Sequence, residues 1–482
     1  MKKLLCIFLL MSIFASACAC GVQVEGGNSS VDVNLTSSLP ESAGEESVTF
    51  SEDSQESCVT SEDSSEPFLD VTLDLLPLFG GFKDTDEEDK ANDFLNFILE
   101  YYSYEAEPLL SIYNHIRKNG YSDSVWREYT GNSLHVWRSL YKKEQETEDN
   151  IRLISMGDAE GGKKTVMTFG GDICFADNYA TMPFLEKQED KLRGCLAKEW
   201  FDIMQSADIA TLNCEYAISD RGEPMPKKMF TFVSKPENTA YYNELGVDFV
   251  TLANNHVFDY GEDAFYDTLD TLDEYGIDRA GAGRNADEAQ RPFYYIIDGR
   301  KVAFISATRA EKYILTPEAK EDSPGVFRCY DPERLIEVIE ETKQNCDYVV
   351  LFVHWGTEYS DVLERVQMST SHDYIDAGAD LIIGTHAHQL QGIEFYKGKA
   401  IFYNLGNFWF NAKSIETGLV RFELDYDGNE EFYFIPGMQE GCKVSYELGT
   451  ERGCEILDHL ASYEPGRVAI DDDGRIYTED EQ

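Results

Sequence analysis

The stretch ADLIIGTHAHQLQG, residues 379–392, shows the pattern on which much of the chain is built. A short apolar run ends in a polar cluster that holds two of the chain's eight histidines, His386 and His388. Side chains two residues apart point to the same side of an extended backbone, so both imidazoles could approach one site. The stretch therefore predicts a buried strand that delivers two histidines to a functional site.

Similar apolar runs recur from Thr165 onward and alternate with helical patterns, for example at 262–275 and 331–344. This alternation predicts an α/β domain with covered sheets over residues 165–436. A closing hairpin is expected to turn at Asp427-Gly428, and residues 437–482 form a C-terminal extension. The runs are TVMTFGG (165–171), ADIATLN (207–213), VDFVTLANN (247–255), KVAFISAT (301–308), DYVVLFVHW (347–355) and KAIFYNLGN (399–407).

Polar side chains follow most of these runs. In α/β folds ligands bind beyond the carboxyl ends of the strands, so side chains that leave several strands converge on one crevice. One such residue alone is usually a turn or cap residue, but their recurrence predicts a shared site. The candidates are Asp172, Asn213, Glu215, Asn254, Asn255, His256, Asp259, His354, Glu358, His386, His388 and Asn407. The histidines in helical or charged settings are expected to be structural or surface residues: His115, His135, His372 and His459.

The donor types in this set indicate a metal centre. Imidazole nitrogens with carboxylate and amide oxygens suit one or two divalent ions such as Zn, Mn or Fe, whereas Ca prefers oxygen alone. The chain has eleven cysteines but no CxxC pair, which argues against a structural zinc cluster. Export would permit disulfides. Cys442 and Cys454 could pair, or the cysteines could be isolated buried residues.

The first residues, MKKLLCIFLLMSIFASACACG, combine a basic start with an apolar run that is too short to span a bilayer. We expect residues 1–20 to be an export signal. The sequence ASAC resembles a bacterial lipobox and predicts lipidation of Cys18, with Cys20 as the alternative residue. A plainly cleaved, secreted form remains the other interpretation.

The segment after the signal is acidic and rich in serine. Residues 21–66 are poor in large apolar side chains and are expected to form a disordered tether, and residues 67–150 show helical periodicity. The formal net charge is −49, from 90 acidic and 41 basic residues. This charge argues against nucleic acid or anionic lipid as a main partner.

Five ordered motifs resemble the CapA-type proteins of bacterial capsule and poly-γ-glutamate synthesis. They are FGGDI, ADIATLNCE, GVDFVTLANNHVFDYG, FVHWGTEY and GTHAHQLQGIEFYKGKAIFYNLGNFWF. That family is similar to the calcineurin-like metallophosphoesterases, which implies a four-layer sandwich of two sheets between helices. The resemblance covers roughly residues 165–436.

The resemblance assigns roles by motif position. The implied metal ligands are Asp172, Asn213, Glu215, Asn255, His354, His386 and His388. His256 is expected to act as a general acid with Asp259 as its orienting partner, and Asn254, Glu358 and Asn407 are expected near the substrate. One departure concerns the first motif: phosphoesterases have Asp-x-His there, whereas this chain has Cys174 two residues after Asp172.

Three functions are compatible with these residues. The first is an exported, membrane-tethered protein in the synthesis, export or anchoring of an anionic capsular polymer such as poly-γ-glutamate. It could act through a metal-dependent hydrolase or transferase site, with the polymer or its synthesis machinery as partner. The second is an extracellular metallophosphoesterase on small phosphate esters. The third is a non-catalytic polymer-binding scaffold with a vestigial site. Metal content separates the two enzyme hypotheses from the scaffold.

Overall fold

The computed structural model describes residues 87–478, except 104–106, 120–121, 123, 145–149, 159–161, 311–314 and 466–467. The expected export signal, the lipidation site at Cys18 or Cys20 and the tether lie outside these residues. The chain divides into two compact units, one of Met1–Thr130 with Trp137–Gln145 and one of Gly131–Val136 with Glu146–Gln482. Within the described residues, no helix is long and apolar enough to cross a membrane.

The first unit contains helices where the sequence shows helical periodicity. They are α3 (Glu87–Tyr101), α4 (Glu107–Asn119), α5 (Ser124–Thr130) and most of α6 (Leu134–Glu144). The Trp137 ring contacts Phe97 edge-on at 6.4 Å, and its indole N–H donates to Thr130 Oγ1 over 3.0 Å. These buried aromatic contacts hold α6 against α3 and α5.

The second unit contains a seven-stranded sheet with the order β1-β9-β10-β12-β13-β15-β14. The strands β10, β12, β13 and β15 are parallel, so their carboxyl ends leave the sheet at one edge. Strands β10 and β12 are buried along their whole length, which accounts for their continuous apolar runs. The bounds are β1 (Ile151–Leu153), β9 (Phe293–Ile297), β10 (Arg300–Thr308), β12 (Tyr348–Trp355), β13 (Leu381–His386), β14 (Ile393–Tyr396) and β15 (Lys399–Phe402).

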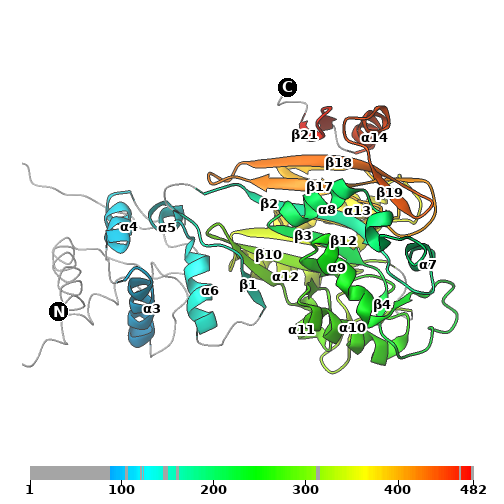
Figure 1. Ribbon diagram of the computed structural model, residues 1–482. Coiled ribbons are helices and arrows are strands. Elements are labelled where there is room, and N and C mark those ends of the chain that lie inside the picture. Colours follow the sequence, from blue (N-terminus) through cyan, green and yellow to red (C-terminus); the bar gives the residue numbers. More distant parts are fainter. Residues whose placement is uncertain are drawn as a thin grey trace, which may run out of the picture. The chain divides into compact units, whose positions relative to one another are not determined.

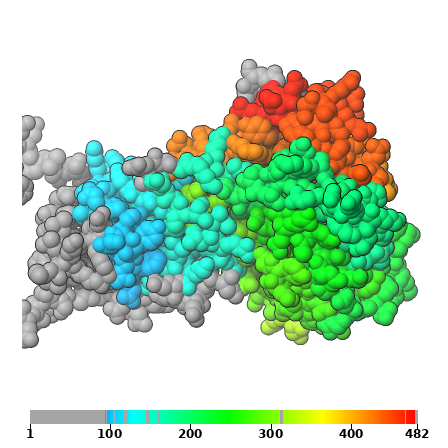
Figure 2. Space-filling model, in the orientation of Figure 1, coloured from blue at the N-terminus to red at the C-terminus, as the bar shows by residue number. Residues whose placement is uncertain are grey.

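A ten-stranded sheet has the order β20-β21-β18-β17-β2-β3-β6-β7, with β16 beside β2 and β19 beside β18. The expected closing hairpin is present, because β17 and β18 pair antiparallel on either side of a turn with Gly428 at φ +92°. Residues after 436 continue this sheet through β19, β20 and β21, and Figure 2 shows this part, orange to red, on the surface of the second unit. The bounds are β2 (Thr165–Ile173), β3 (Ile209–Cys214), β6 (Phe249–Thr251), β7 (Asp278–Ala280), β16 (Asn407–Trp409), β17 (Ile415–Leu424), β18 (Glu430–Glu440), β19 (Lys443–Tyr446), β20 (Val468–Ile470) and β21 (Arg475–Thr478).

Smaller elements complete the second unit. Two-stranded sheets join β4 (Ala217–Ile218) to β5 (Val233–Ser234) and β8 (Ala282–Gly283) to β11 (Gly325–Val326). The helices are α7 (Thr181–Leu185), α8 (Lys198–Ser206), α9 (Ala240–Leu245), α10 (Gly261–Tyr275), α11 (Ala286–Gln290), α12 (Glu333–Lys343), α13 (Arg365–Ala377) and α14 (Glu451–Ser462), with short 3-10 turns at Lys191–Gly194 and Pro236–Thr239.

The two large sheets pack face to face (Figure 1) through a shared aromatic core. Phe169 and Phe249 from the ten-stranded sheet contact Phe304 and Phe352 from the seven-stranded sheet, with ring centroids 5.0 to 6.4 Å apart. Such packing excludes water and stabilises the fold by roughly 25 cal/mol per Å² of buried apolar surface. It also fixes the distance between the two rows of strand ends.

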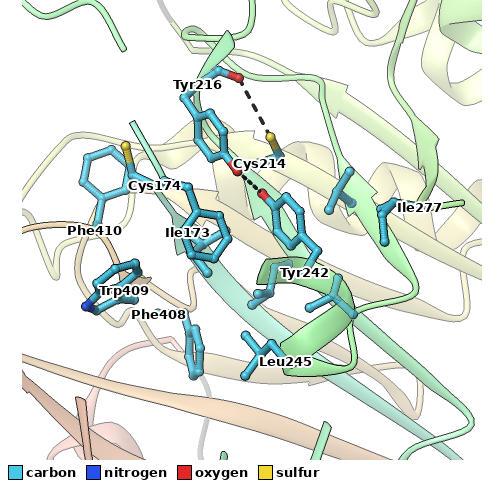
Figure 3. Packing of buried hydrophobic residues seen from close by; sticks show 14 of the residues in the cluster. Ile173, Cys174, Cys214, Tyr216, Tyr242, Leu245, Ile277, Phe408, Trp409 and Phe410 are labelled. Atoms are coloured by element: carbon cyan, nitrogen blue, oxygen red, sulfur yellow. Dashed lines mark hydrogen bonds between the residues drawn. The ribbon is translucent and has the colours of Figure 1, made fainter. Parts of the chain in front are cut away.

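Helices cover the outer faces of the sheets. Trp200 of α8, Tyr242 of α9 and Phe265 of α10 are buried against the ten-stranded sheet, in the cluster of which Figure 3 shows a part. Helix α12 packs on β10 and β12 and also against α13. The predicted α/β class is therefore confirmed as a mixed fold with several sheets flanked by helices.

The cysteines of the described part are free thiols. The Cys442 sulfur lies 3.6 Å from the Ala180 carbonyl oxygen, and Cys454 lies on α14. A Cys442–Cys454 disulfide is therefore wrong, and isolated thiols are the correct interpretation. Burial raises the pKa of the Cys442 thiol, in keeping with a packing role.

The inter-sheet core gives a test of the fold. Phe304 is fully buried, so Phe304→Ala leaves a cavity and should lower the free energy of unfolding by about 3 to 5 kcal/mol. Val362 is 72 % exposed, and Val362→Ala should change it by less than about 0.5 kcal/mol. Urea unfolding of the two variants and the wild type measures both values. A similar small effect at Phe304 would contradict the inter-sheet packing.

Candidate metal centre

Strand ends from both large sheets meet at one place. In the ten-stranded sheet, Asp172 pairs with Asn407 on one side and with Asn213 on the other. In the seven-stranded sheet, β12 ends at Trp355, directly after His354, and Trp355 pairs with His386. The His386 N–H donates to Asp172 Oδ2 over 3.3 Å and so joins the two sheets directly. The convergence expected from parallel strands is present.

The expected buried strand is present as β13, but the backbone does not stay extended from His386 to His388. Strand β13 ends at His386, where φ is +95°, and φ is +54° at His388. Non-glycine residues in this region cost of order 1–3 kcal/mol each and persist only where surrounding contacts hold them. Here the Tyr359 N–H donates to the Ala387 carbonyl oxygen over 2.6 Å. The turn places the His386 and His388 ring centroids 6.2 Å apart. Both rings thus reach one site through a turn and not through an extended backbone.

A first group of metal-binding side chains consists of Glu215, His354 and His386. One donor atom from each lies within 4.8 Å of the others, and all three side chains are buried. His354 Nε2 is 3.4 Å from Glu215 Oε1 and 3.1 Å from His386 Nδ1. Asn255 Oδ1 is 2.7 Å from the same His354 nitrogen, which brings a fourth donor to this group.

A second group consists of Asp172, Glu215 and His388, again with donor atoms within 4.8 Å. His388 Nδ1 lies 3.2 Å from Asp172 Oδ2, and His388 Nε2 lies 3.9 Å from Glu215 Oε1. Glu215 is common to both groups. Its carboxylate therefore has the position of a group that could bridge two ions.

The electrostatics of these groups fit a cation. Both carboxylate oxygens of Glu215 are buried and have no hydrogen-bond donor among the residues that the structure describes. Burial and the nearby Asp172 charge raise the pKa of Glu215 well above its usual value. Burial lowers the pKa of His354 to about 3 and that of His386 well below 6.5, so both imidazoles are neutral. Lone pairs of several buried donors thus converge on one place, and a divalent ion there would accept them.

Asp172 differs from Glu215 because it has partners. Asn213 Nδ2 donates to Asp172 Oδ1 over 2.8 Å, and His388 approaches Oδ2. Burial alone would raise the pKa of Asp172, but the hydrogen bond and charge of His388 outweigh it and hold the pKa below its usual value. This carboxylate is accordingly ready to bind a cation.

Two expected ligands are asparagines with different surroundings. Asn255 presents its amide oxygen to His354, as a ligand would. The Asn213 oxygen instead accepts hydrogen bonds from Thr251 Oγ1 at 2.8 Å and Asn254 Nδ2 at 3.2 Å. Asn213 therefore orients Asp172 and its own neighbours, and its oxygen is already engaged.

The residues expected near a substrate also lie in distinct places. Asn254 is fully buried; it donates to the Cys214 carbonyl oxygen over 2.8 Å, and its own oxygen accepts from His256 N at 3.0 Å, so it shapes a turn. Asn407 Oδ1 is 2.7 Å from His388 Nδ1 and orients that ring. Glu358 is exposed and lies in the turn after β12.

His256 and Asp259 form a buried pair, with Nδ1 to Oδ2 at 2.6 Å. Asp259 Oδ2 also accepts from Phe232 N over 2.8 Å, and Lys228 Nζ lies 2.8 Å from Oδ1. The Phe232 ring packs 4.4 Å from the His256 ring, centroid to centroid. The imidazole is thus held by contacts on its Nδ1 side and on one face.

Sequence reasoning missed Thr385 and Lys228. Thr385 Oγ1 is 2.8 Å from His354 Nδ1 and turns the other ring nitrogen toward the donors. Its place before His386 on β13, opposite His354 on the neighbouring strand, is a signal that could have identified it. Lys228 follows the exposed Lys227 and precedes the exposed Met229, so no sequence pattern marks it.

The departure in the first motif has a structural explanation. Cys174 is fully buried in the apolar cluster of Figure 3, together with Phe410 and Trp409. Burial raises the pKa of its thiol well above the usual value, so it stays uncharged. The side chain that replaces the expected histidine is therefore part of the hydrophobic core.

Neutral His354 makes the metal-free protein sensitive to acid. Its pKa falls from 6.5 to about 3 on folding, so the unfolded chain binds this proton at higher pH than the folded chain. The folded protein is therefore most stable, as far as His354 is concerned, above pH 6.5. Its free energy of unfolding decreases as the pH falls toward 3, by at most about 1.4 kcal/mol per pH unit. We expect chelator-treated His354→Gln to lose less stability than the wild type between about pH 7 and 5 in urea unfolding. An equal loss of unfolding free energy with pH in the variant and the wild type would contradict this.

Comparison with known proteins places these motifs in a family. The bacterial capsule synthesis protein family PGA_cap matches residues 166–412. Similar curated proteins include the PGA biosynthesis protein CapA of Bacillus subtilis (strain 168), 31 % identical over 48 % of this chain and 62 % of its own length. The capsule biosynthesis protein CapA of Bacillus anthracis is 33 % identical over 43 % of this chain and 52 % of its own length. A probable polyglutamine synthesis accessory protein of Mycobacterium tuberculosis (strain H37Rv) is 28 % identical over 42 % of this chain and 55 % of its own length.

The aligned part of the chain thus spans about half to three fifths of each of these relatives. The matched residues 166–412 contain both donor groups and the His256–Asp259 pair. With half of its length matched and all of these residues inside the match, the chain belongs to the bacterial capsule synthesis protein family PGA_cap.

Proposed function

We propose that this protein acts in the synthesis, export or anchoring of an anionic capsular polymer such as poly-γ-glutamate, through a metal-dependent hydrolase or transferase site. Family membership and the names of the relatives support the polymer. The observation that carries the catalytic part is the Glu215 carboxylate, which is buried without a hydrogen-bond donor in the described structure and is shared by two groups of donors.

The residues that would hold the metal follow from the donor geometry. One ion would take Glu215, His354, His386 and Asn255, and a second would take Asp172, Glu215 and His388. Mixed nitrogen and oxygen donors suit Mn, Zn or Fe. When bound, such an ion polarises an acyl or phosphoryl oxygen and lowers the pKa of a water molecule.

The protein's own residues supply proton transfer and exclusion of water. The Asp259 carboxylate, 2.6 Å from His256 Nδ1, would stabilise the protonated imidazolium, whose Nε2–H would give the proton to a leaving group and leave the neutral ring hydrogen-bonded to Asp259. Phe232 packs against His256 and Phe410 against His388, with ring centroids 4.4 and 4.6 Å apart. These rings keep the two ends of the site apolar, which strengthens the electrostatic interactions between the polar groups.

The fold and the first motif bear on the type of reaction. We infer that the two packed sheets with outer helices are the sandwich of the calcineurin-like metallophosphoesterases. That relation supports a second candidate, hydrolysis of small phosphate esters. The burial of Cys174 in the core removes one expected ligand and supports a third, a polymer-binding scaffold with a reduced site.

Metal binding gives the direct test. His386→Ala and His388→Ala each remove a buried nitrogen donor. The affinity of each variant for Mn²⁺ or Zn²⁺ should therefore be more than about 100-fold lower than that of the wild type. The control is His372→Ala, because His372 stacks on Tyr396 and contacts Glu394 Oε1 at 3.0 Å, in another part of the fold. Metal analysis and thermal midpoint should be measured together. Unchanged metal in both site variants would overturn the proposed centre.

The same proteins test the reaction. Metal-loaded wild type is incubated with poly-γ-glutamate and, separately, with p-nitrophenyl phosphate. Cleavage or transfer of the polymer that disappears in His386→Ala supports the leading proposal. Turnover of the phosphate ester alone would move the function to the second candidate, and no turnover of either by a metal-loaded protein would favour the scaffold.

We also propose export and anchoring through a lipid on Cys18, which lies outside the described residues. Cys18→Ala should move the protein from the membrane fraction to the medium, because it removes the residue that would carry the acyl chains. Fractionation of cells that express each form measures this. Retention of the variant at the membrane would show that Cys20 is used or that no lipid is involved.

A further inference from the structure

Lys228 is a cation turned inward from an otherwise exposed loop. It lies between β4 and β5, where Met229 is 86 % and Phe230 55 % exposed. The Lys228 side chain is only 4 % exposed. Lysine is rarely buried unless its ammonium group is paired, because removal of the charge from water costs several kcal/mol. Its contacts must therefore compensate this cost.

The ammonium group contacts two neighbouring parts of the candidate centre. Its Nζ lies 2.8 Å from Asp259 Oδ1, and it donates a hydrogen bond to the carbonyl oxygen of Asn255. That carbonyl oxygen also accepts from Thr316 Oγ1 over 2.9 Å. The other Asp259 oxygen is the one that holds His256 at 2.6 Å. One cation thus touches the backbone of a metal donor and the carboxylate that orients the proton donor.

Asn255 and His256 are adjacent in the chain, but the first is a proposed metal donor and the second the proposed proton donor. The Asn255 side-chain oxygen lies 2.7 Å from His354 Nε2, within the first donor group. The His256 ring lies against Phe232 and Asp259. A small rotation of the backbone between them would move both side chains at once. The Lys228 ammonium contacts this turn through the Asn255 carbonyl oxygen.

We propose that Lys228 is a positioning residue that locks the Asn255-His256 turn, so that the metal donor and the proton donor keep one mutual geometry. The inference rests on the proposed metal-dependent function and adds a residue to it. Lys228 does not touch the reacting atoms in this role. It acts through Asn255 on metal affinity and through Asp259 on His256.

The test is the Mn²⁺ affinity of purified protein, measured by titration calorimetry with Mn²⁺ alone. Lys228→Met keeps the stem and removes the charge, and it should raise the Mn²⁺ dissociation constant by about 10- to 100-fold, as loss of a contact that supports a ligand does. Lys227→Met is the matched control, because Lys227 is exposed, and it should leave the constant unchanged. An unchanged constant in Lys228→Met, with a lowered thermal midpoint, would show a merely structural lysine and overturn the proposal.

A second pair of variants covers failure of Lys228→Met to fold. Asp259→Asn and the double variant Asp259→Asn/Lys228→Met are compared, because removal of both charges leaves no unpaired buried ion. The double variant should still bind Mn²⁺ more weakly than Asp259→Asn, since the Asn255 carbonyl oxygen has lost the Lys228 ammonium and, among the described residues, keeps only the Thr316 hydroxyl as a donor. Equal affinities would overturn the proposal.

The outcomes separate this inference from the proposed function. Mn²⁺ binding by the wild type with equal affinity in the Lys228 variants removes only the positioning role. Weakened Mn²⁺ binding in these variants, without turnover of any substrate by the wild type, keeps the positioning role and removes the enzyme. Absence of Mn²⁺ binding by the wild type overturns both.

Discussion

The Glu215 carboxylate is withdrawn from water at the junction of the two sheets, and the other donors are arranged around it. Removal of an unpaired carboxylate from water costs several kcal/mol, even after the surroundings relax. Within the described residues no donor compensates Glu215, and its pKa is raised as a result. The neutral imidazoles of His354 and His386 add lone pairs rather than protons. A bound cation would convert this unfavourable cluster into a stabilising one, because binding energy available to the folded state adds to its stability.

Rigid elements hold this cluster together. Five of the donors leave the ends of parallel strands or the turns directly after them, and an aromatic core keeps the sheets at a fixed separation. The positive φ values at His386 and His388 show that the last step needs a strained turn. The Tyr359 N–H holds this turn through the Ala387 carbonyl oxygen at 2.6 Å. Backbones also approach closely beside the site, where Asp172 N donates to the Gly406 carbonyl oxygen at 2.8 Å and a Cβ on Gly171 would lie 1.9 Å from that oxygen. Packing in the fold thus compensates the strain in the site.

The sequence was informative where a periodic pattern has a direct physical cause. Apolar runs such as 348–355 became buried parallel strands, and polar residues after them reached one edge, because parallel strands share their direction. The side-chain roles were less predictable. Asn213 and Asn254 were expected at a metal or substrate, yet their hydrogen bonds go to the protein. Lys228 carried no pattern at all, since its burial depends on a loop folded back onto Asp259. Such contacts between distant residues are set by tertiary structure alone.

The charges of the site fall into two parts. When both are ionised, Asp172 and Glu215 supply two negative charges among the metal donors, while His354 and His386 remain neutral. One divalent ion would therefore neutralise this part. A second ion would leave an excess of positive charge in a buried place, which is costly unless an anionic ligand enters with it. Asp259 and Lys228 form the other part, and their ion pair is balanced without any metal. The proton donor His256 is thus attached to the part whose charge does not change when the metal binds.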